Sequence, residues 1–109
     1  MTDLPFHLLA AMASRDEQVR YINGATKDEY LVPEDLLNDA YHFCERVQHP
    51  GVWATLDDHQ KRSIEILKAR IEAFPDEGLA STTIIDDPHW LAVADQSRSA
   101  LAALGQNAP

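Results

Sequence analysis

The amino-acid sequence predicts an all-α fold, a compact bundle of about four amphipathic helices with one ordered loop before the last helix. Two observations carry this prediction. Apolar residues recur at intervals of three and four in four segments, and Pro, Gly or capping side chains bound these segments. Only one short segment is rich in β-branched residues, and a single strand cannot make a sheet. A three-helix core with a docked N-terminal helix is the alternative arrangement.

The first helix is expected from Leu4 to about Ile22. Pro5 is compatible with it because proline is tolerated in the first helical turn. The pair Asn23-Gly24 ends it, since glycine readily adopts the left-handed conformation that closes a helix. Its predicted apolar face comprises Leu4, Leu8, Ala11, Met12, Val19 and Ile22.

The second helix is expected to begin at Pro33, whose fixed backbone angle suits the first helical position. Glu34 and Asp35 follow in the first turn, where the helix dipole favours carboxylates. The segment His49-Pro50-Gly51 breaks the helix. A broad apolar stripe predicts a central position for it; the stripe comprises Leu36, Leu37, Ala40, Tyr41, Phe43, Cys44 and Val47.

The third helix follows the sequence Thr55-Leu56-Asp57-Asp58, which offers an N-cap with acidic residues in the first turn, and it stops at Pro75. Its predicted core positions are Ile64, Leu67, Ile71 and Phe74. Opposite charges four residues apart predict ion pairs on a solvated outer face. The predicted pairs are Asp57 with Lys61, Asp58 with Arg62, and Lys68 with Glu72.

The fourth helix is expected after Asp87-Pro88, an N-cap followed by a first-position proline, and it ends at Gly105. Its predicted apolar face comprises Trp90, Ala94, Ser97, Leu101 and Leu104. Residues 75–86 precede this helix and are interpreted as the ordered loop, although residues 81–85 are β-branched enough to form a strand. The prediction is therefore one helical domain over residues 1–105, with a frayed C-terminal tail at residues 106–109.

Charge is the strongest functional signal, because eighteen Asp and Glu oppose nine Lys and Arg and give a net charge of -9. This balance disfavours nucleic acids and anionic membranes, and it favours a basic protein as partner. A basic run in the third helix is offset by four acidic residues between Asp57 and Glu72, so direct nucleic-acid binding is not expected.

The expected location is the cytoplasm. Cys44 is the single cysteine, so an intramolecular disulfide is excluded and a reducing compartment is favoured. The apolar residues 4–13 contain His7 and lack a basic start, so neither a signal peptide nor a membrane span is predicted.

The pattern of histidines, cysteine and carboxylates predicts no catalytic residue, metal or cofactor. Asp86, Asp87 and His89 form the densest group of possible metal ligands, but capping of the fourth helix explains Asp87, and no recognisable set of Cys and His ligands is present. His42 and Cys44 are two apart, which directs them about 200° apart around a helix, so they do not form a base and nucleophile. This pattern favours a binding protein over an enzyme.

The segment between the first two helices is the expected binding surface, because it joins acidic and large apolar side chains. Aromatic rings would anchor a partner there, while carboxylates meet its basic residues. The predicted binding residues are Tyr21, Asp28, Glu29, Tyr30, Glu34, Asp35 and Trp53.

Three functional hypotheses follow. The first is a small acidic protein-binding regulator or inhibitor that covers a basic partner, in the manner of immunity proteins and antitoxins. The second is an accessory subunit or adaptor whose exposed apolar stripe completes a larger complex. The third is a small metal-binding protein or enzyme built around Asp86, Asp87, His89 or the other histidines.

Overall fold

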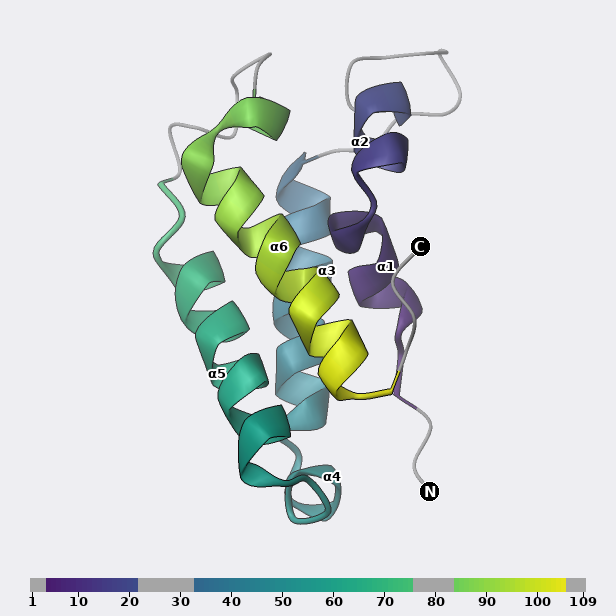
Figure 1. The fold of residues 1–109 in the computed structure, drawn as a ribbon, viewed down its shortest axis with the longest axis vertical. Helices are drawn as coiled ribbons and strands as arrows, with labels where there is room; N and C mark the ends of the chain where they lie inside the picture. The colour runs from purple at the N-terminus through teal and green to yellow at the C-terminus, as the bar shows by residue number, and fades with distance from the viewer. Residues whose placement is uncertain (1–3, 22–32, 76–83, 106–109) are drawn as a thin grey trace.

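A computed structural model describes residues 4–21, 33–75 and 84–105 (Figure 1). The described residues contain helices and connecting turns but no strand, which confirms the all-α prediction. The α-helices are α1 (His7–Ala13), α2 (Arg15–Tyr21), α3 (Pro33–Val47), α4 (Pro50–Trp53), α5 (Asp58–Glu72) and α6 (Pro88–Ala103). A 3₁₀ turn, η2 (Ile84–Asp86), precedes α6. None of the described helices is long and apolar enough to cross a membrane.

Helices α1, α3, α5 and α6 surround one apolar core. Helix α6 packs against α5 and α1, while α3 contacts α1 and α5 on the other side of the bundle (Figure 1). Trp90 of α6 and Phe43 of α3 are the largest fully buried side chains. Leu9, Met12 and Ile64 complete the centre of the core from α1 and α5. The predicted apolar stripes therefore meet in one cluster, as expected of a helical bundle.

The first predicted helix is interrupted, so the expectation of one helix from Leu4 to about Ile22 is wrong. Ser14 has extended backbone angles (φ -104°, ψ 102°) and separates α1 from α2. Its hydroxyl accepts a hydrogen bond from the Glu17 backbone nitrogen at 3.3 Å, which caps α2. Because the break rotates the following residues, Val19 is 48% exposed instead of lying on the apolar face.

The other predicted helix starts are confirmed. Pro33 begins α3. Asp57 caps α5 in a reciprocal arrangement, because its carboxylate accepts from the Gln60 backbone nitrogen at 2.8 Å and the Gln60 side chain accepts from the Asp57 nitrogen at 2.9 Å. Asp87 caps α6 by accepting from the His89 nitrogen at 2.8 Å.

The structure also shows the predicted helix ends and the described end of the loop before α6. Beyond α6, Gly105 has a φ of +86°, the left-handed conformation expected of a closing glycine. The break after α3 contains the single-turn helix α4, which starts at Pro50. At the described end of the loop before α6, η2 buries Ile84 and Ile85 without forming a strand.

None of the three ion pairs predicted along α5 forms among the described residues. Lys61 Nζ lies 5.8 Å from the centroid of the Trp53 ring instead. Lys68 Nζ donates to the Gln48 side chain at 3.0 Å and lies 5.3 Å from the Tyr41 ring centroid. Exposed pairs four residues apart contribute only about 0.2–0.5 kcal/mol, so the two lysines contact partly buried aromatic rings instead.

Candidate functional site

The structure places part of the predicted acidic surface at one end of the bundle. Glu34 and Asp35 are exposed in the first turn of α3 and form no ion pair with another described residue. The backbone of Tyr21 ends α2 at the same end of the molecule (Figure 1). Three further predicted binding residues, Asp28, Glu29 and Tyr30, lie outside the described residues.

Trp53 lies at the opposite end of the bundle, in α4 (Figure 1). Helix α3 has 15 residues, and this length separates α4 from Glu34 and Asp35 by roughly 22 Å. The Trp53 ring also packs against the core and under Lys61. The structure therefore does not bring Trp53 together with the acidic residues that begin α3.

Most described Lys and Arg side chains contact other parts of the protein. Arg15 donates to the Ile85 carbonyl at 2.9 Å, Arg70 donates to the Ala92 carbonyl at 2.9 Å, and Arg98 donates to the Ala13 carbonyl at 3.1 Å. Arg15 also pairs with Asp86, and Arg98 with Asp95. Together with the two lysines above the aromatic rings, these cations connect helices to one another.

Many carboxylates show the opposite behaviour, because they are exposed and form no ion pair within the described residues. They are Asp16, Glu17, Glu34, Asp35, Asp58, Glu65 and Glu72. The excess negative charge is therefore present on the surface as solvated carboxylates.

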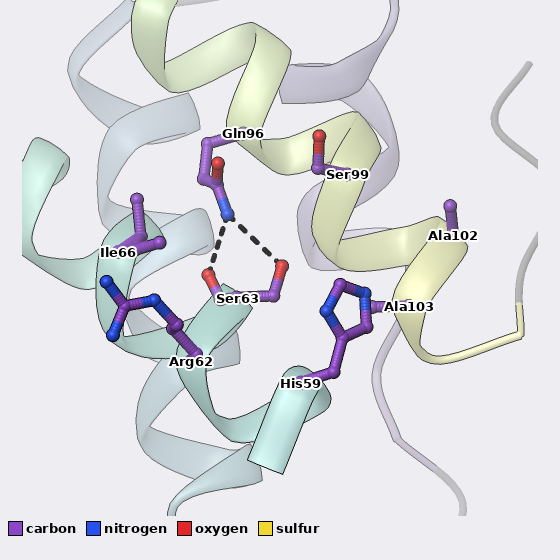
Figure 2. Close-up of a pocket in the computed structure, with 8 residues that line it drawn as sticks. All are labelled: His59, Arg62, Ser63, Ile66, Gln96, Ser99, Ala102 and Ala103. Carbon is purple, nitrogen blue, oxygen red and sulfur yellow. Dashed lines mark hydrogen bonds between the residues drawn. The ribbon is translucent and has the colours of Figure 1, made fainter. Parts of the chain in front are cut away.

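An open groove of about 720 Å³ lies between α5 and α6 (Figure 2). No Asp or Glu lines it, although the protein has eighteen of them. Its lining consists of His59, Arg62, Ser63, Ile66, Gln96, Ser99, Ala102 and Ala103. A positively charged guanidinium and several neutral polar groups thus face a space free of carboxylates.

Two buried polar residues form the floor of the groove. Gln96 Nε2 donates to the Ser63 carbonyl at 2.9 Å and to its Oγ at 3.1 Å. Figure 2 shows this contact, with the Arg62 and His59 side chains on opposite sides of it. At one end of the groove, Gln60 Nε2 donates to the Ala103 carbonyl at 3.0 Å and fixes the end of α6 against α5.

Neither Gln96 nor Ser63 is among the site residues that the sequence predicts. A signal was present, since Gln96 lies three residues after Val93 and four before Ala100, both of which are buried. A polar residue at such a position requires hydrogen-bond partners in the interior. Only the structure identifies those partners, because Ser63 lies on another helix.

A second buried glutamine, Gln18, bridges α1, α2 and α6. Its Nε2 donates to the carbonyls of Ala11 at 3.0 Å and Met12 at 2.7 Å, where α1 ends. Its Oε1 accepts from Trp90 Nε1 at 3.0 Å. Both ends of the side-chain amide therefore have protein partners, which accounts for Gln18 as a structural residue.

The sequence prediction that Cys44 belongs to the core is confirmed. Its side chain is fully buried. Burial away from water raises the pKa of the Cys44 thiol to about 12, despite the opposing influence of Lys68. The group therefore stays a neutral thiol at physiological pH, which is unfavourable for nucleophilic chemistry.

The predicted group of Asp86, Asp87 and His89 consists of residues with contacts of their own. Asp86 pairs with Arg15 at 2.7 Å. The hydrogen bond from the His89 backbone nitrogen lowers the pKa of the Asp87 carboxyl, and the His89 ring lies 3.3 Å from the same oxygen. In residues 4–21, 33–75 and 84–105, no three His, Cys, Asp or Glu side chains gather as a set of metal ligands.

Comparison of the chain with protein-family models, curated proteins and solved structures finds no match.

Proposed function

We propose that this protein is a small acidic regulator or inhibitor that binds a basic partner protein. The distribution of charge supports the proposal. Internal contacts engage most described cations, whereas many described carboxylates are exposed and form no ion pair with another described residue, in a chain of net charge -9. Exposed carboxylates of this kind accelerate the association of a basic surface and can accept hydrogen bonds from it.

The proposed interface is the end of the bundle where α3 begins. Glu34 and Asp35 contribute exposed carboxylates there. The preceding residues 28–30, which are Asp-Glu-Tyr, extend the same combination of acid and aromatic groups along the chain. Tyr21 is the further proposed anchor, and Trp53 is left out because its ring already packs against Lys61. A lone, buried Cys44 suits the proposed cytoplasmic location.

The exposure of apolar side chains favours this proposal over an adaptor. An adaptor with an apolar docking stripe would expose several large apolar side chains on one face. Within the described residues, Val19 and Leu91 are the exposed large apolar side chains. They belong to different helices, so they do not form a stripe on one helix face.

The experiment that tests the proposal compares two variants of identical net charge. One neutralises the proposed interface (Glu34→Gln with Asp35→Asn), and the other neutralises exposed, unpaired carboxylates on α5 (Glu65→Gln with Glu72→Gln). Each protein is immobilised and exposed to nuclease-treated lysate of the source cells, then washed at low and at high salt. We expect wild type and the α5 variant to retain a basic protein stoichiometrically, and the interface variant to lose most of it.

Salt gives the second criterion, because screening shortens the reach of exposed charges from about 10 Å at 0.1 M to about 3 Å at 1 M ionic strength. The proposal predicts release of the partner by the high-salt wash. Retention at high salt contradicts charge-driven recognition. Equal loss of the partner from both variants contradicts the placement of the interface at the start of α3, and the absence of any basic partner contradicts the proposal as a whole.

A further inference from the structure

We propose that the groove between α5 and α6 binds a small organic carboxylate that also carries an N–H donor. This inference goes beyond the proposed function, because the groove lies away from the start of α3 and its lining contains no acidic residue. Groups with unused hydrogen-bonding capacity face the groove, and together they define the chemistry of the ligand.

The first such group is Gln96 Oε1. Gln96 is only 8% exposed, and its nitrogen is committed to Ser63. Its oxygen accepts no hydrogen bond from a described residue. No fully buried side-chain nitrogen or oxygen in the described residues lacks a partner, so this oxygen is not fully enclosed, and Gln96 lines the groove. A fixed carbonyl oxygen of this kind can accept a hydrogen bond from an N–H group of a ligand.

The second group is the Arg62 guanidinium. Arg62 is exposed, and the ion pairs of the described residues do not include it, even though Asp58 lies four residues before it. Its planar set of donors matches the two oxygens of a carboxylate. Since the groove lining has no carboxylate of its own, a carboxylate from a ligand can occupy this position.

The remaining lining residues indicate which polar and apolar groups the rest of the ligand carries. His59 and Ser99 offer polar groups along the groove, while Ile66 and the two alanines 102 and 103 offer apolar surface (Figure 2). An acyl amino acid combines these features, since it has a carboxylate, an amide N–H and an apolar acyl group. The same chemistry occurs at the carboxyl end of a peptide.

The experiment measures binding to the full chain through shifts of backbone amide signals in ¹⁵N-correlated NMR spectra. The probes are hippurate, its neutral methyl ester, and acetyl-trialanine with a free carboxylate. Saturable shifts at residues 59–66 and 96–103 with millimolar hippurate are expected, and the ester should bind at least about tenfold more weakly, the loss typical of removing a charged hydrogen-bond partner. Tighter binding of hippurate than of acetyl-trialanine identifies a free small molecule as the ligand, and the reverse identifies a peptide terminus.

Matched variants locate the site. Arg62→Gln should weaken hippurate binding about tenfold or more, whereas Arg46→Gln, which removes another exposed arginine outside the groove, should leave it unchanged. Ala102→Leu should block the groove, whereas Ala69→Leu, at an exposed position of α5 outside the lining, should not. The proposal is overturned by the absence of saturable shifts in the groove, by equal binding of the ester, or by equal effects of the two arginine variants.

Discussion

The two glutamines that are buried in the described part of the chain have different roles. Gln18 is 1% exposed, and both its nitrogen and its oxygen bond to protein groups. Gln96 is 8% exposed, and its nitrogen, but not its oxygen, bonds to a described residue, Ser63. A buried amide whose atoms are all partnered organises the fold. A buried amide with one open oxygen instead presents a fixed acceptor to whatever enters the adjoining groove.

The position of each glutamine explains this difference. Gln18 follows the break at Ser14, where α1 ends. Its amide nitrogen donates to the Met12 carbonyl and to the Ala11 carbonyl, which also accepts from the Ser14 backbone nitrogen. It also satisfies the indole nitrogen of the fully buried Trp90. Gln96 lies where α5 and α6 meet at the surface, and one side of its amide faces the groove.

The largest effect is expected at Ile64, the core residue that follows the groove residue Ser63. This residue adjoins Ser63 in the chain but is fully buried in the core. Ile64→Asp places an unpaired charge there and should unfold the protein, as measured by circular dichroism and thermal melting. Glu65→Asn, one residue further along and exposed, serves as the control and should melt close to wild type. A wild-type melting temperature for Ile64→Asp would refute the core assignment.

Removal of the fully partnered glutamine should have the next largest effect. Gln18→Leu removes the Gln18 partner of the Met12 carbonyl and of the Trp90 N–H, and it leaves the Ala11 carbonyl with the Ser14 backbone nitrogen alone, so we expect a loss of about 2–4 kcal/mol of unfolding free energy. Urea denaturation measures this loss. Adding Trp90→Phe removes the indole N–H that has lost its partner. The two substitutions together should therefore lower the free energy of unfolding by less than the sum of their separate effects. Strict additivity would contradict the proposed Gln18–Trp90 coupling.

Removal of the groove glutamine should cost less. Gln96→Leu leaves the Ser63 groups beside an open groove that water can enter. We expect a loss of about 1 kcal/mol in the same urea measurement. A loss as large as that of Gln18→Leu would remove the distinction between the two glutamines.

The smallest effect concerns the cap of α6, the helix that carries both Trp90 and Gln96. The pKa of the Asp87 carboxyl is lower in the folded protein because it accepts the hydrogen bond from the His89 nitrogen. Its contribution to stability is therefore complete above the unfolded pKa of about 3.9 and disappears as the pH falls through the lower folded value.

The variant Asp87→Asn tests this contribution. Asparagine is also a good N-cap but does not ionise, so the variant should lack the acid-dependent part of the stability. Melting temperatures measured against pH should show wild type losing more stability than the variant below about pH 4. Parallel pH profiles of the two proteins would contradict the role of the Asp87 carboxylate.

Helix boundaries could be predicted from the sequence where the determining interaction is local. Pro33, Asp57 and Asp87 start their helices through backbone geometry and capping within a few residues. The cap at Ser14 is also local, since its hydroxyl accepts from the Glu17 nitrogen three residues later, but the contact of Gln18 with Trp90 joins residues 72 apart and could not be predicted. Apolar periodicity continued across the break and concealed it.

The candidate sites were less predictable for the same reason. The acidic excess is a property of composition and was evident at once, but the engagement of the cations depends on distant carbonyls such as that of Ala13 with Arg98. The groove depends on a contact between Ser63 and Gln96, 33 residues apart on different helices. Local patterns do not encode such contacts, which arise only when the helices pack.

Hydrogen exchange of the two glutamine side-chain amides tests the central comparison most directly, since it requires no substitution and no ligand. The account predicts slow exchange for the Gln18 amide, limited by opening of the α1, α2 and α6 contacts, and much faster exchange for the Gln96 amide through local opening at the groove. Equal protection of the two amides would contradict the account, because it would mean that Gln96 is as enclosed as Gln18.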